Sequence, residues 1–513
     1  MEASLSNIMD VCEYMDKHMK DDVKFGSHEQ IFLPRLALDV ATKRDVIQNI
    51  VANDEDLYMN KQEEQDFVDK VHRYGRKIFA TCVYCDLPMT CLKALLDDGL
   101  TDADMPISGA RVERLKQKRK FRTSFIPNQK HFSAAYLAMD AIQSLDNGKG
   151  SFGDVWKVKI HPDHCGFSSG ANGQNQFAMK VTEQGPYERR EQSFHREMAT
   201  AGLNHPHLVK CLTSFTFGDK YHMIYELANC DLEAFMQKNR DPTMIPGLTE
   251  LSLAQQLYGL AAALKLVHDQ GETPISEPGK LNVKRENGGK TGYIHDIKPE
   301  NILVFVYGKD LHWFRLSDFS CAKVVDWLVI VSGVNGKRES QKTRSSSGTP
   351  IYRAPECFLA QETSRPYDLW SLGCVYLELL VWFMEGLNGL IAFRESRMAP
   401  IFPPDGAEYE GFFCIADSKP YLRQPVLDKI EEMQQYCTGA LSTIAEAIPH
   451  LLHINPKTRP TAAELVQRLE HLNDDYDPTP TAYSPGNPSS PFMVSESDSD
   501  SDLGDMFIVT KPT

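Results

Sequence analysis

Apolar residues in the first hundred positions recur at the three- and four-residue spacing of amphipathic helices. One group lies within residues 46–51 and another within residues 67–78, and charged residues fill the positions between them. This spacing predicts a helical region over residues 1–125, in which we find no catalytic motif. We expect this region to bind a regulatory partner or to act as an autoinhibitory unit.

The end of the helical region is strongly basic. Residues 111–122 contain seven Lys and Arg. A solvated linker or helix face explains such a run most simply, and a signal for nuclear import or for an acidic partner is the alternative.

A different pattern follows the basic run. Strand-like alternation comes first, and a helical pattern over residues 462–469 closes the segment, which predicts a large domain over residues 132–473. Its longest apolar stretch, residues 369–393, approaches the length of a membrane span. This stretch contains Glu378 and Glu385, so a buried helix explains it better and we expect no membrane association.

Beyond residue 473 the composition changes again. Residues 475–490 are rich in Pro, Ser, Tyr and Asn, and residues 495–502 alternate Ser with Glu or Asp. Such a segment has too little apolar surface to offset the entropy of ordering. We therefore expect residues 474–513 to form a disordered acidic tail.

Composition narrows the class of protein. The chain has 513 residues, 42% of them hydrophobic, which is enough for a large globular core. Its formal net charge of −15 disfavours nucleic acid and membrane surfaces as partners and favours a basic substrate. The acidic first 30 residues lack the apolar core of a secretory signal, so we expect an intracellular protein, cytoplasmic or nuclear.

We expect the twelve cysteines, including Cys82, Cys85 and Cys91, to be free thiols rather than zinc ligands.

A glycine-rich run carries the first chemical signal. Gly148, Gly150, Ser151 and Gly153 lead into Val155 and a strand-like alternation. Without a Cβ, such a turn between two strands can bring its backbone N–H groups close to phosphates. A dinucleotide-binding fold needs a helix after the glycines, and a strand pattern follows them here.

The next apolar strand pattern, residues 177–181, contains Ala178 and Lys180. A lysine on such a strand, downstream of a glycine loop, can reach between nucleotide phosphates. A buried lysine requires an anionic partner. Glu197, in a helical pattern, is the best candidate, and Glu191 is the alternative.

This order of glycine loop, lysine strand and glutamate helix resembles the small lobe of eukaryotic protein kinases. The resemblance implies that residues 221–227 lead into the kinase hinge, with Tyr225 as the gatekeeper. It also implies that backbone groups from Glu226 to Ala228 bind the adenine and that Asp231 contacts the ribose.

Residues 296–301, DIKPEN, are similar to the kinase catalytic loop. Phosphoryl transfer needs a carboxylate for the hydroxyl proton, cations near the phosphates and ligands for Mg²⁺. Asp296, Lys298 and Asn301 match these roles in turn. Asp318, in a run similar to Asp-Phe-Gly, adds a second oxygen ligand for Mg²⁺. The lysine two places after the aspartate is typical of the serine/threonine branch.

Later motifs extend the resemblance towards the C-terminus. Residues 348–356 are similar to the end of the activation segment, and residues 368–373 are similar to the buried helix behind it. The resemblance also implies that Arg459 pairs with Glu356.

Two positions depart from the kinase pattern. His295 replaces the arginine that receives a phosphorylated activation loop, and an imidazole cannot offer a bidentate fork, which argues against control by loop phosphorylation. Ser320 stands where glycine is usual, and its Cβ restricts the backbone. Residues 161–176 and 271–292 are insertions, which we interpret as surface loops, with docking sites as the alternative.

The sequence therefore predicts an α+β, bilobal protein-kinase fold, with a mostly β small lobe that contains one key helix and a mostly α large lobe. We expect a serine/threonine kinase that uses ATP and Mg²⁺ and acts on a protein substrate. The alternative is a pseudokinase-like scaffold that binds nucleotide or partners without catalysis, as Ile294, His295 and Ser320 would suit.

Overall fold

The computed structural model describes most of the chain. The described residues are 5–19, 24–25, 28–29, 32–107, 118–133, 142–145, 154–167, 175–183, 186–200, 202–217, 220–269, 290–308, 310–326, 328–329, 338–339, 343–344, 350–359, 362–402, 405–473 and 507–510. They fall into two compact units, which we treat separately. The first unit combines residues 1–184, 211–227 and 484–513, and the second combines residues 185–210 and 228–483.

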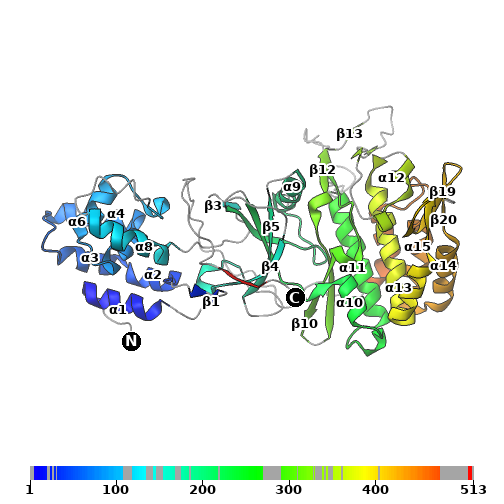
Figure 1. Ribbon diagram of the computed structural model, residues 1–513, viewed down its shortest axis with the longest axis horizontal. Coiled ribbons are helices and arrows are strands. Elements are labelled where there is room, and N and C mark those ends of the chain that lie inside the picture. The colour runs from blue at the N-terminus through cyan, green and yellow to red at the C-terminus, as the bar shows by residue number, and fades with distance from the viewer. Residues whose placement is uncertain are drawn as a thin grey trace, which may run out of the picture. The chain divides into compact units, whose positions relative to one another are not determined.

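The first unit begins with a bundle of helices, coloured blue to cyan in Figure 1. The helices are α1 (Ile8–His18), α2 (Arg35–Ala41), α3 (Arg44–Ala52), α4 (Lys61–Tyr74), α5 (Arg76–Tyr84) and α6 (Met89–Asp97). Their apolar faces converge on one core, in which α5 is buried on nearly all sides. Asn60 caps α4 by accepting hydrogen bonds from the N–H groups of Gln62 and Glu63. The predicted helical region is confirmed.

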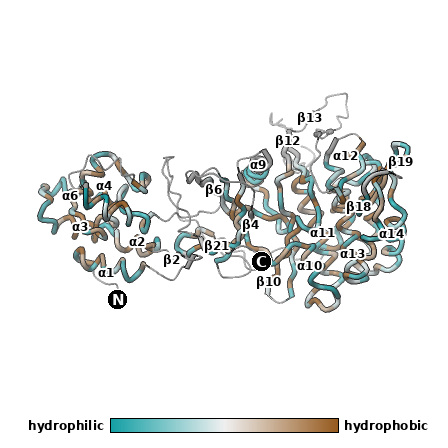
Figure 2. The backbone as a smooth tube through the Cα atoms, in the orientation of Figure 1, coloured by the Kyte–Doolittle hydropathy of each residue, from teal (hydrophilic) through white to brown (hydrophobic). Residues whose placement is uncertain are grey.

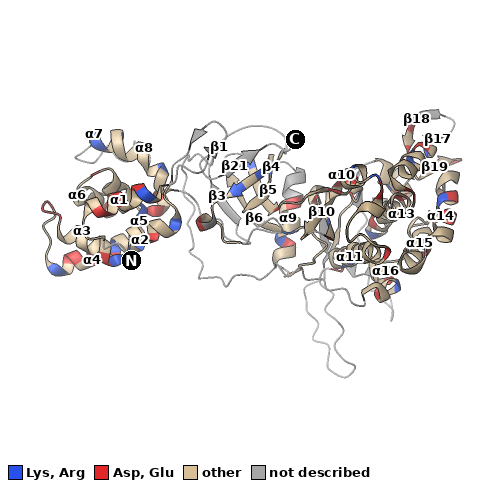
Figure 3. Cartoon of the chain, turned by 90° about the horizontal axis from the view of Figure 1, so that it is seen from below, with Lys and Arg blue, Asp and Glu red and all other residues tan. Residues whose placement is uncertain are grey.

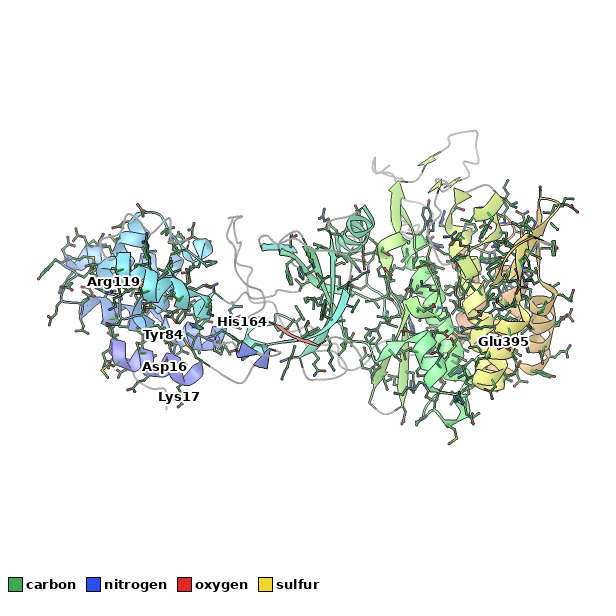
Figure 4. The ribbon with its side chains drawn as sticks, in the orientation of Figure 1. Asp16, Lys17, Tyr84, Arg119, His164 and Glu395 are labelled. Atoms are coloured by element: carbon green, nitrogen blue, oxygen red, sulfur yellow. The ribbon has the colours of Figure 1, made fainter. Side chains whose placement is uncertain are left out.

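The bundle extends further than the sequence indicates. Four short helical elements follow α6: α7 (Lys118–Lys120), a π-helical turn (Phe121–Phe125), α8 (Ile126–Asn128) and a 3-10 turn (Gln129–Phe132). Phe121, Phe125 and Phe132 all lie in the core of the bundle. The ring of Phe132 lies 5.5 Å from that of Tyr84, which is labelled in Figure 4. The boundary expected between residues 125 and 132 therefore moves past Phe132, because these aromatic rings fill the bundle.

The basic run and the cysteines also fall in this bundle. Lys120 forms an ion pair with Asp86 at 2.9 Å, and residues 111–117 lie outside the described residues. Cys82, Cys85 and Cys91 are buried free thiols. Burial raises the pKa of Cys82 well above that of an ordinary thiol, so this sulfur is a packing group.

A six-stranded sheet forms the rest of the first unit, in the order β21-β4-β5-β7-β6-β3. The strands are β3 (Ile142–Leu145), β4 (Asp154–Ile160), β5 (Gln176–Glu183), β6 (Cys211–Phe217), β7 (Lys220–Glu226) and β21 (Phe507–Thr510). Strands β4, β5, β7 and β6 pair antiparallel, and Lys180 on β5 lies opposite Val155 and Met223. Lys157 and Lys159 are exposed on β4, where Figure 3 shows blue.

The two outer strands differ from expectation. A turn between two strands at the glycine run predicts that the strand before the glycines pairs with β4, the strand after them. In the structure β3 instead pairs in parallel with β6. β21 pairs antiparallel with β4, although the composition of the last forty residues predicts a disordered tail. The sequence Phe-Ile-Val-Thr has high strand propensity, and the edge of β4 offers it backbone partners. Residues 474–506 and 511–513 lie outside the described residues.

The second unit is mostly helical. Its helices are α9 (Pro186–Thr200), α10 (Leu232–Lys238), α11 (Glu250–His268), α12 (Pro355–Leu359), α13 (Arg365–Ser396), α14 (Gln424–Tyr436), α15 (Gly439–Leu451) and α16 (Ala462–Arg468). Its strands include β8 (Cys230–Asp231), β9 (Lys290–Tyr293), β10 (Ile302–Tyr307), β11 (Leu311–Leu316), β12 (Lys323–Asp326), β17 (Met398–Phe402), β18 (Asp405–Glu410), β19 (Phe413–Ala416) and β20 (Lys419–Leu422). One large apolar core lies among α11, α13 and α15, and Figure 2 shows brown along α11 and α13.

Helix α13 contains the long apolar stretch of the sequence. Among the described residues it is the one helix long and apolar enough to cross a membrane. Trp370, Tyr376 and Trp382 are fully buried in the apolar core, and the helix also carries the buried carboxylates of Asp368 and Glu378. Helix α13 is therefore a buried helix of the second unit, which is what Glu378 and Glu385 within the apolar stretch predict.

A sharp bend at Gly386 divides α13. Gly386 has φ of 70° and ψ of −173°, a conformation that is essentially restricted to glycine. A Cβ at this position would lie 2.8 Å from the carbonyl oxygen of Arg240, which also accepts a hydrogen bond from the N–H group of Leu387. The bend therefore depends on the absence of a side chain.

We expect Gly386→Ala to lower the free energy of unfolding by about 3 kcal/mol, because the substitution adds a steric clash to an unfavourable φ. Gly308→Ala is the matched control, since Gly308 has φ of 66° but a Cβ added there would meet no atom within 4 Å. That change should cost about 1 kcal/mol. Guanidinium unfolding followed by tryptophan fluorescence, to which the buried Trp370 and Trp382 contribute, measures both losses, and equal losses would contradict the account of the bend.

Candidate active site

The predicted catalytic loop lies between β9 and β10 in the second unit. Asn301 donates from Nδ2 to the backbone oxygen of Asp296 at 2.8 Å and to its Oδ2 at 2.9 Å. Lys298 Nζ lies 3.3 Å from the same carboxylate oxygen. The side chains of Asp296 and Lys298 are 15% and 21% exposed, so both are held in place and still reach solvent. The structure therefore brings together three of the predicted site residues.

A buried carboxylate holds the backbone of this loop. Asp368 on α13 accepts hydrogen bonds from the N–H groups of Ile294 at 3.0 Å and His295 at 2.8 Å, and from His268 Nε2 at 2.9 Å. Burial favours the neutral form of Asp368, but these donors outweigh it and hold its pKa below the ordinary value. A charged carboxylate in the core thus fixes the two residues that precede Asp296.

The Asp318 segment is tied to the catalytic loop. Ser317 donates from its N–H group and from Oγ to the backbone oxygen of Asn301, at 2.9 and 2.8 Å. Asp318 itself has φ of 54°, and its carboxylate accepts from the N–H group of Ser320 at 3.3 Å. The unfavourable φ is tolerated because the bonds of Ser317 fix the chain on the N-terminal side.

These contacts fit the predicted magnesium ligands. Because Asn301 donates its amide nitrogen to Asp296, its Oδ1 is the atom that can face a cation. The carboxylate of Asp318 and this amide oxygen are hard ligands of the kind that Mg²⁺ prefers.

The residues after Asp318 pack into the second unit. Phe319 is 1% exposed, and its ring stacks on that of Phe194 from α9 at 4.3 Å. Ser320 lies in a 3-10 turn and has no positive φ. In this arrangement the backbone of Ser320 has a conformation that a residue with a Cβ adopts without strain.

His295 is a core residue. It is 1% exposed, its ring is parallel to that of Tyr293 at 5.2 Å, and the ring of Tyr367 lies 5.4 Å away. A side chain buried between two tyrosine rings is not placed to receive a phosphate from solvent. This burial supports the expectation that loop phosphorylation does not act through position 295.

The expected nucleotide-binding residues are only partly described. Gly148, Gly150, Ser151 and Gly153 lie outside the described residues. In the first unit, Val155 on β4 is 49% exposed, Ala178 on β5 lies opposite Tyr225, and Glu226 on β7 is 8% exposed and lies opposite Phe177.

Two further residues of this group belong to the second unit. Ala228 precedes β8, and Asp231 caps α10 by accepting a hydrogen bond from the N–H group of Ala234 at 2.8 Å. Asp231 thus has a structural role beside the predicted contact with ribose.

The partner of Lys180 stays a prediction. Lys180 is half-buried in the first unit, and both candidate glutamates lie on α9 in the second unit. Glu191 is 2% exposed and Glu197 is half-buried.

The predicted pair of Arg459 and Glu356 is confirmed. Arg459 donates from Nη1 and Nη2 to the two carboxylate oxygens of Glu356 at 2.7 and 2.8 Å. The Arg459 side chain is fully buried, and its guanidinium lies 5.0 Å from the ring centre of Trp370. This bidentate pair fixes the end of the activation segment to the second unit.

Two residues that support the site give no clear signal in the sequence. His268 is the last residue of α11, and only its hydrogen bond to Asp368 reveals its role. Ser317 immediately precedes Asp318, but a serine beside a motif is too common to single out without its bonds to Asn301.

Residues 146–469 match the family model described as the protein kinase domain. The match covers more than half of the chain and includes every expected site residue. The chain therefore belongs to the protein kinase family, and the predicted kinase fold is confirmed.

Curated relatives agree with this assignment. The chain is 25% identical over 378 residues to a probable LRR receptor-like serine/threonine-protein kinase of Arabidopsis thaliana, covering 70% of this chain and 33% of the relative. It is 24% identical over 282 residues to cyclin-dependent kinase D-1 of Arabidopsis thaliana, covering 54% and 59%. It is 28% identical over 248 residues to dual specificity tyrosine-phosphorylation-regulated kinase 3 of Homo sapiens, covering 45% and 32%. The chain thus spans about a third to three fifths of the length of these relatives.

Proposed function

We propose that this chain is an active serine/threonine protein kinase that transfers the γ-phosphoryl group of ATP to hydroxyl groups of a protein substrate. The observation that carries the proposal is the carboxylate of Asp296, which accepts a hydrogen bond from Asn301 and lies 3.3 Å from the Lys298 nitrogen. A pseudokinase-like scaffold has no need of a partly exposed aspartate held by an asparagine and a lysine.

In this mechanism Asp296 orients the substrate hydroxyl and accepts its proton as the oxygen attacks the γ-phosphorus. The bond between that phosphorus and the β,γ-bridging oxygen breaks, and ADP leaves. Asn301 fixes the carboxylate, so little reorganisation is needed during the reaction. Lys298, 3.3 Å from Asp296, places a positive charge where negative charge develops on the transferred group. Mg²⁺, held by Asn301 and Asp318, would neutralise phosphate charge.

Serine and threonine are the proposed acceptors. Lys298 is typical of the serine/threonine branch, and two of the relatives are named as a serine/threonine-protein kinase or a dual specificity kinase. The test uses three peptides that differ only in one Ser, Thr or Tyr, with radiolabelled ATP and Mg²⁺. We expect label on the Ser and Thr peptides, and label on the Tyr peptide alone would contradict the proposed acceptor.

A further inference from the structure

Strand β21 occupies an edge of the six-stranded sheet that the sequence assigns to another segment. It pairs antiparallel with β4, and the register places Phe507 opposite Ile160 and Thr510 opposite Lys157. Figure 1 shows this strand in red beside β4. The other edge of β4 is paired with β5. A strand has only two edges, so β4 cannot pair with a further strand while β21 is in place.

The strand expected at this edge is the one that precedes the glycine run. The sequence predicts that residues 148–153 form a turn between two adjacent strands. The strands that flank this run are β3 and β4, and the order of the sheet places β5, β7 and β6 between them. β3 pairs in parallel with β6 instead. The two strands that should frame the glycine turn are therefore separated while β21 is paired.

This separation bears on the binding of nucleotide. A turn between two strands keeps a tight shape only when the strands that enter and leave it lie side by side, because their pairing holds the turn closed. A closed turn is what brings successive backbone N–H groups towards a phosphate. The arrangement in which β21 pairs with β4 thus lacks the frame that the predicted phosphate contact requires.

The two segments that can use the edge of β4 are evenly matched in length. β21 is four residues long, and so is β3. Each pairs through its backbone at an outer edge of the sheet, where short strands gain little from the pairing and can be replaced. The sheet therefore has two arrangements of similar stability, one with β21 and one with β3 beside β4.

Charge and connectivity favour the approach of the tail to β4. Residues 495–505, which precede β21, contain five Asp and Glu and no Lys or Arg. Lys157 and Lys159 are exposed on β4. Opposite charges on two parts of one chain attract each other, and pairing within one chain raises the effective concentration of the strand at the edge.

We propose that β21 is an autoinhibitory strand, which occupies the edge of β4 that the strand before the glycine run must join for ATP to bind tightly. The inference deepens the proposed function and rests on its ATP site. Release of β21 frees the edge, and β3 then leaves β6 and pairs with β4. A protein that captures Phe507–Thr510 as an added strand would activate the chain in the same way.

The first test places proline in β21 of the full-length chain. Alternate residues of a strand direct their N–H groups to opposite sides, so one of Ile508 and Val509 donates towards β4, and proline at both positions removes that donor. We expect Ile508→Pro combined with Val509→Pro to lower the Kd for ATP about tenfold, as when β21 is paired in about nine tenths of the parent molecules. Calorimetric titration with ATP and Mg²⁺ measures the Kd, and kcat at saturating ATP should be unchanged.

The matched control is Thr481→Pro combined with Ala482→Pro. It places two adjacent prolines in the same tail, before the strand. Its Kd for ATP should equal that of the parent. Guanidinium unfolding of both double variants should give the stability of the parent, which separates the release of β21 from a change in the fold.

A disulfide tests the same contact in the opposite direction. Opposite residues of an antiparallel pair have Cα atoms about 4.5–5.5 Å apart, which a disulfide can bridge. We expect the chain with Lys157→Cys and Thr510→Cys to form this bond on mild oxidation, because these positions are opposite in the register. The oxidised form should bind ATP at least about tenfold more weakly than the same chain reduced with dithiothreitol.

Two controls accompany the disulfide. Lys159→Cys combined with Thr510→Cys is two residues out of register, with Cα atoms about 7–8 Å apart, and should not form the bond. The parent has twelve free cysteines and should keep its ATP affinity under the same oxidant. Mass spectrometry of tryptic peptides identifies the new bond.

Three outcomes would overturn the inference. ATP binding by the double-proline variant that is equal to that of the parent, or weaker, shows that β21 does not compete with the ATP site. Absence of the disulfide in the matched pair shows that β21 does not occupy the edge of β4 in solution. Equal affinity in the oxidised and reduced forms shows that the pairing does not hinder ATP. Tighter ATP binding by the double-proline variant without any transfer supports the inference, and it is then the proposed catalysis that fails.

Discussion

Replacing Asp296 with asparagine should lower kcat for phosphoryl transfer about a thousandfold, because the amide cannot accept the hydroxyl proton. The shape of the side chain is unchanged, so the backbone contact from Asn301 should persist. We therefore expect the affinity for ATP and the stability of the variant to stay close to those of the parent. Single-turnover transfer from radiolabelled ATP to a serine peptide measures the change.

The control for this experiment is Asp428→Asn. Asp428 is an exposed aspartate on α14 that accepts a hydrogen bond from Gln424 at 2.7 Å. Its substitution makes the same chemical change outside the site and should leave kcat unaltered. Equal transfer by the Asp296→Asn variant and the parent would remove Asp296 from the role of base.

Replacing Asp368 with alanine should lower the free energy of unfolding of the second unit by about 4 kcal/mol and abolish transfer. Three donors lose their acceptor in a fully buried position, and an unpaired buried polar group is costly. Transfer fails because the two residues before Asp296 are no longer fixed. Guanidinium unfolding followed by tryptophan fluorescence gives the stability, and the peptide assay gives the rate.

Asp269→Ala is the comparison for this loss. The carboxylate of Asp269 is 22% exposed and pairs with Arg365 at 3.5 Å, so its removal should cost less than about 1 kcal/mol. A loss as small as this from Asp368→Ala would show that the buried carboxylate does not hold the loop.

The stability that Asp368 contributes should depend on pH. Its pKa is lower in the folded chain than the ordinary value of 3.8. The contribution is therefore fully present above pH 3.8 and is lost as pH falls through the lower folded pKa. The difference in unfolding free energy between the parent and Asp368→Ala should be constant near neutral pH and should shrink in acid. A difference that grows below pH 3.8 would contradict the lowered pKa.

The sequence predicts the reacting residues well because they lie close together along the chain in a recognisable order. Asp296, Lys298 and Asn301 lie within six positions, so a short motif fixes which side chains meet. The pair of Arg459 and Glu356 spans 103 positions, and only the resemblance to protein kinases predicts it.

Other features depend on packing that no local pattern shows. Arg394 donates a hydrogen bond to Glu378, 16 positions earlier on the same helix, because the chain bends at Gly386, and the sequence alone suggests a continuous helix there. Phe132 belongs to the helical bundle because its ring meets Tyr84, which lies 48 positions earlier. The strand β21 forms because an edge of the sheet offers backbone partners, and composition alone predicts disorder for the tail.

The most direct test of the central claim is whether the purified chain transfers phosphate at all. The chain is incubated with ATP and Mg²⁺ and with a protein substrate, and mass spectrometry then counts the phosphate on serine and threonine. We predict phosphorylated serine or threonine that requires Mg²⁺ and disappears when EDTA is added. Bound ATP with no phosphate on the substrate or on the chain itself would contradict the account and identify a scaffold.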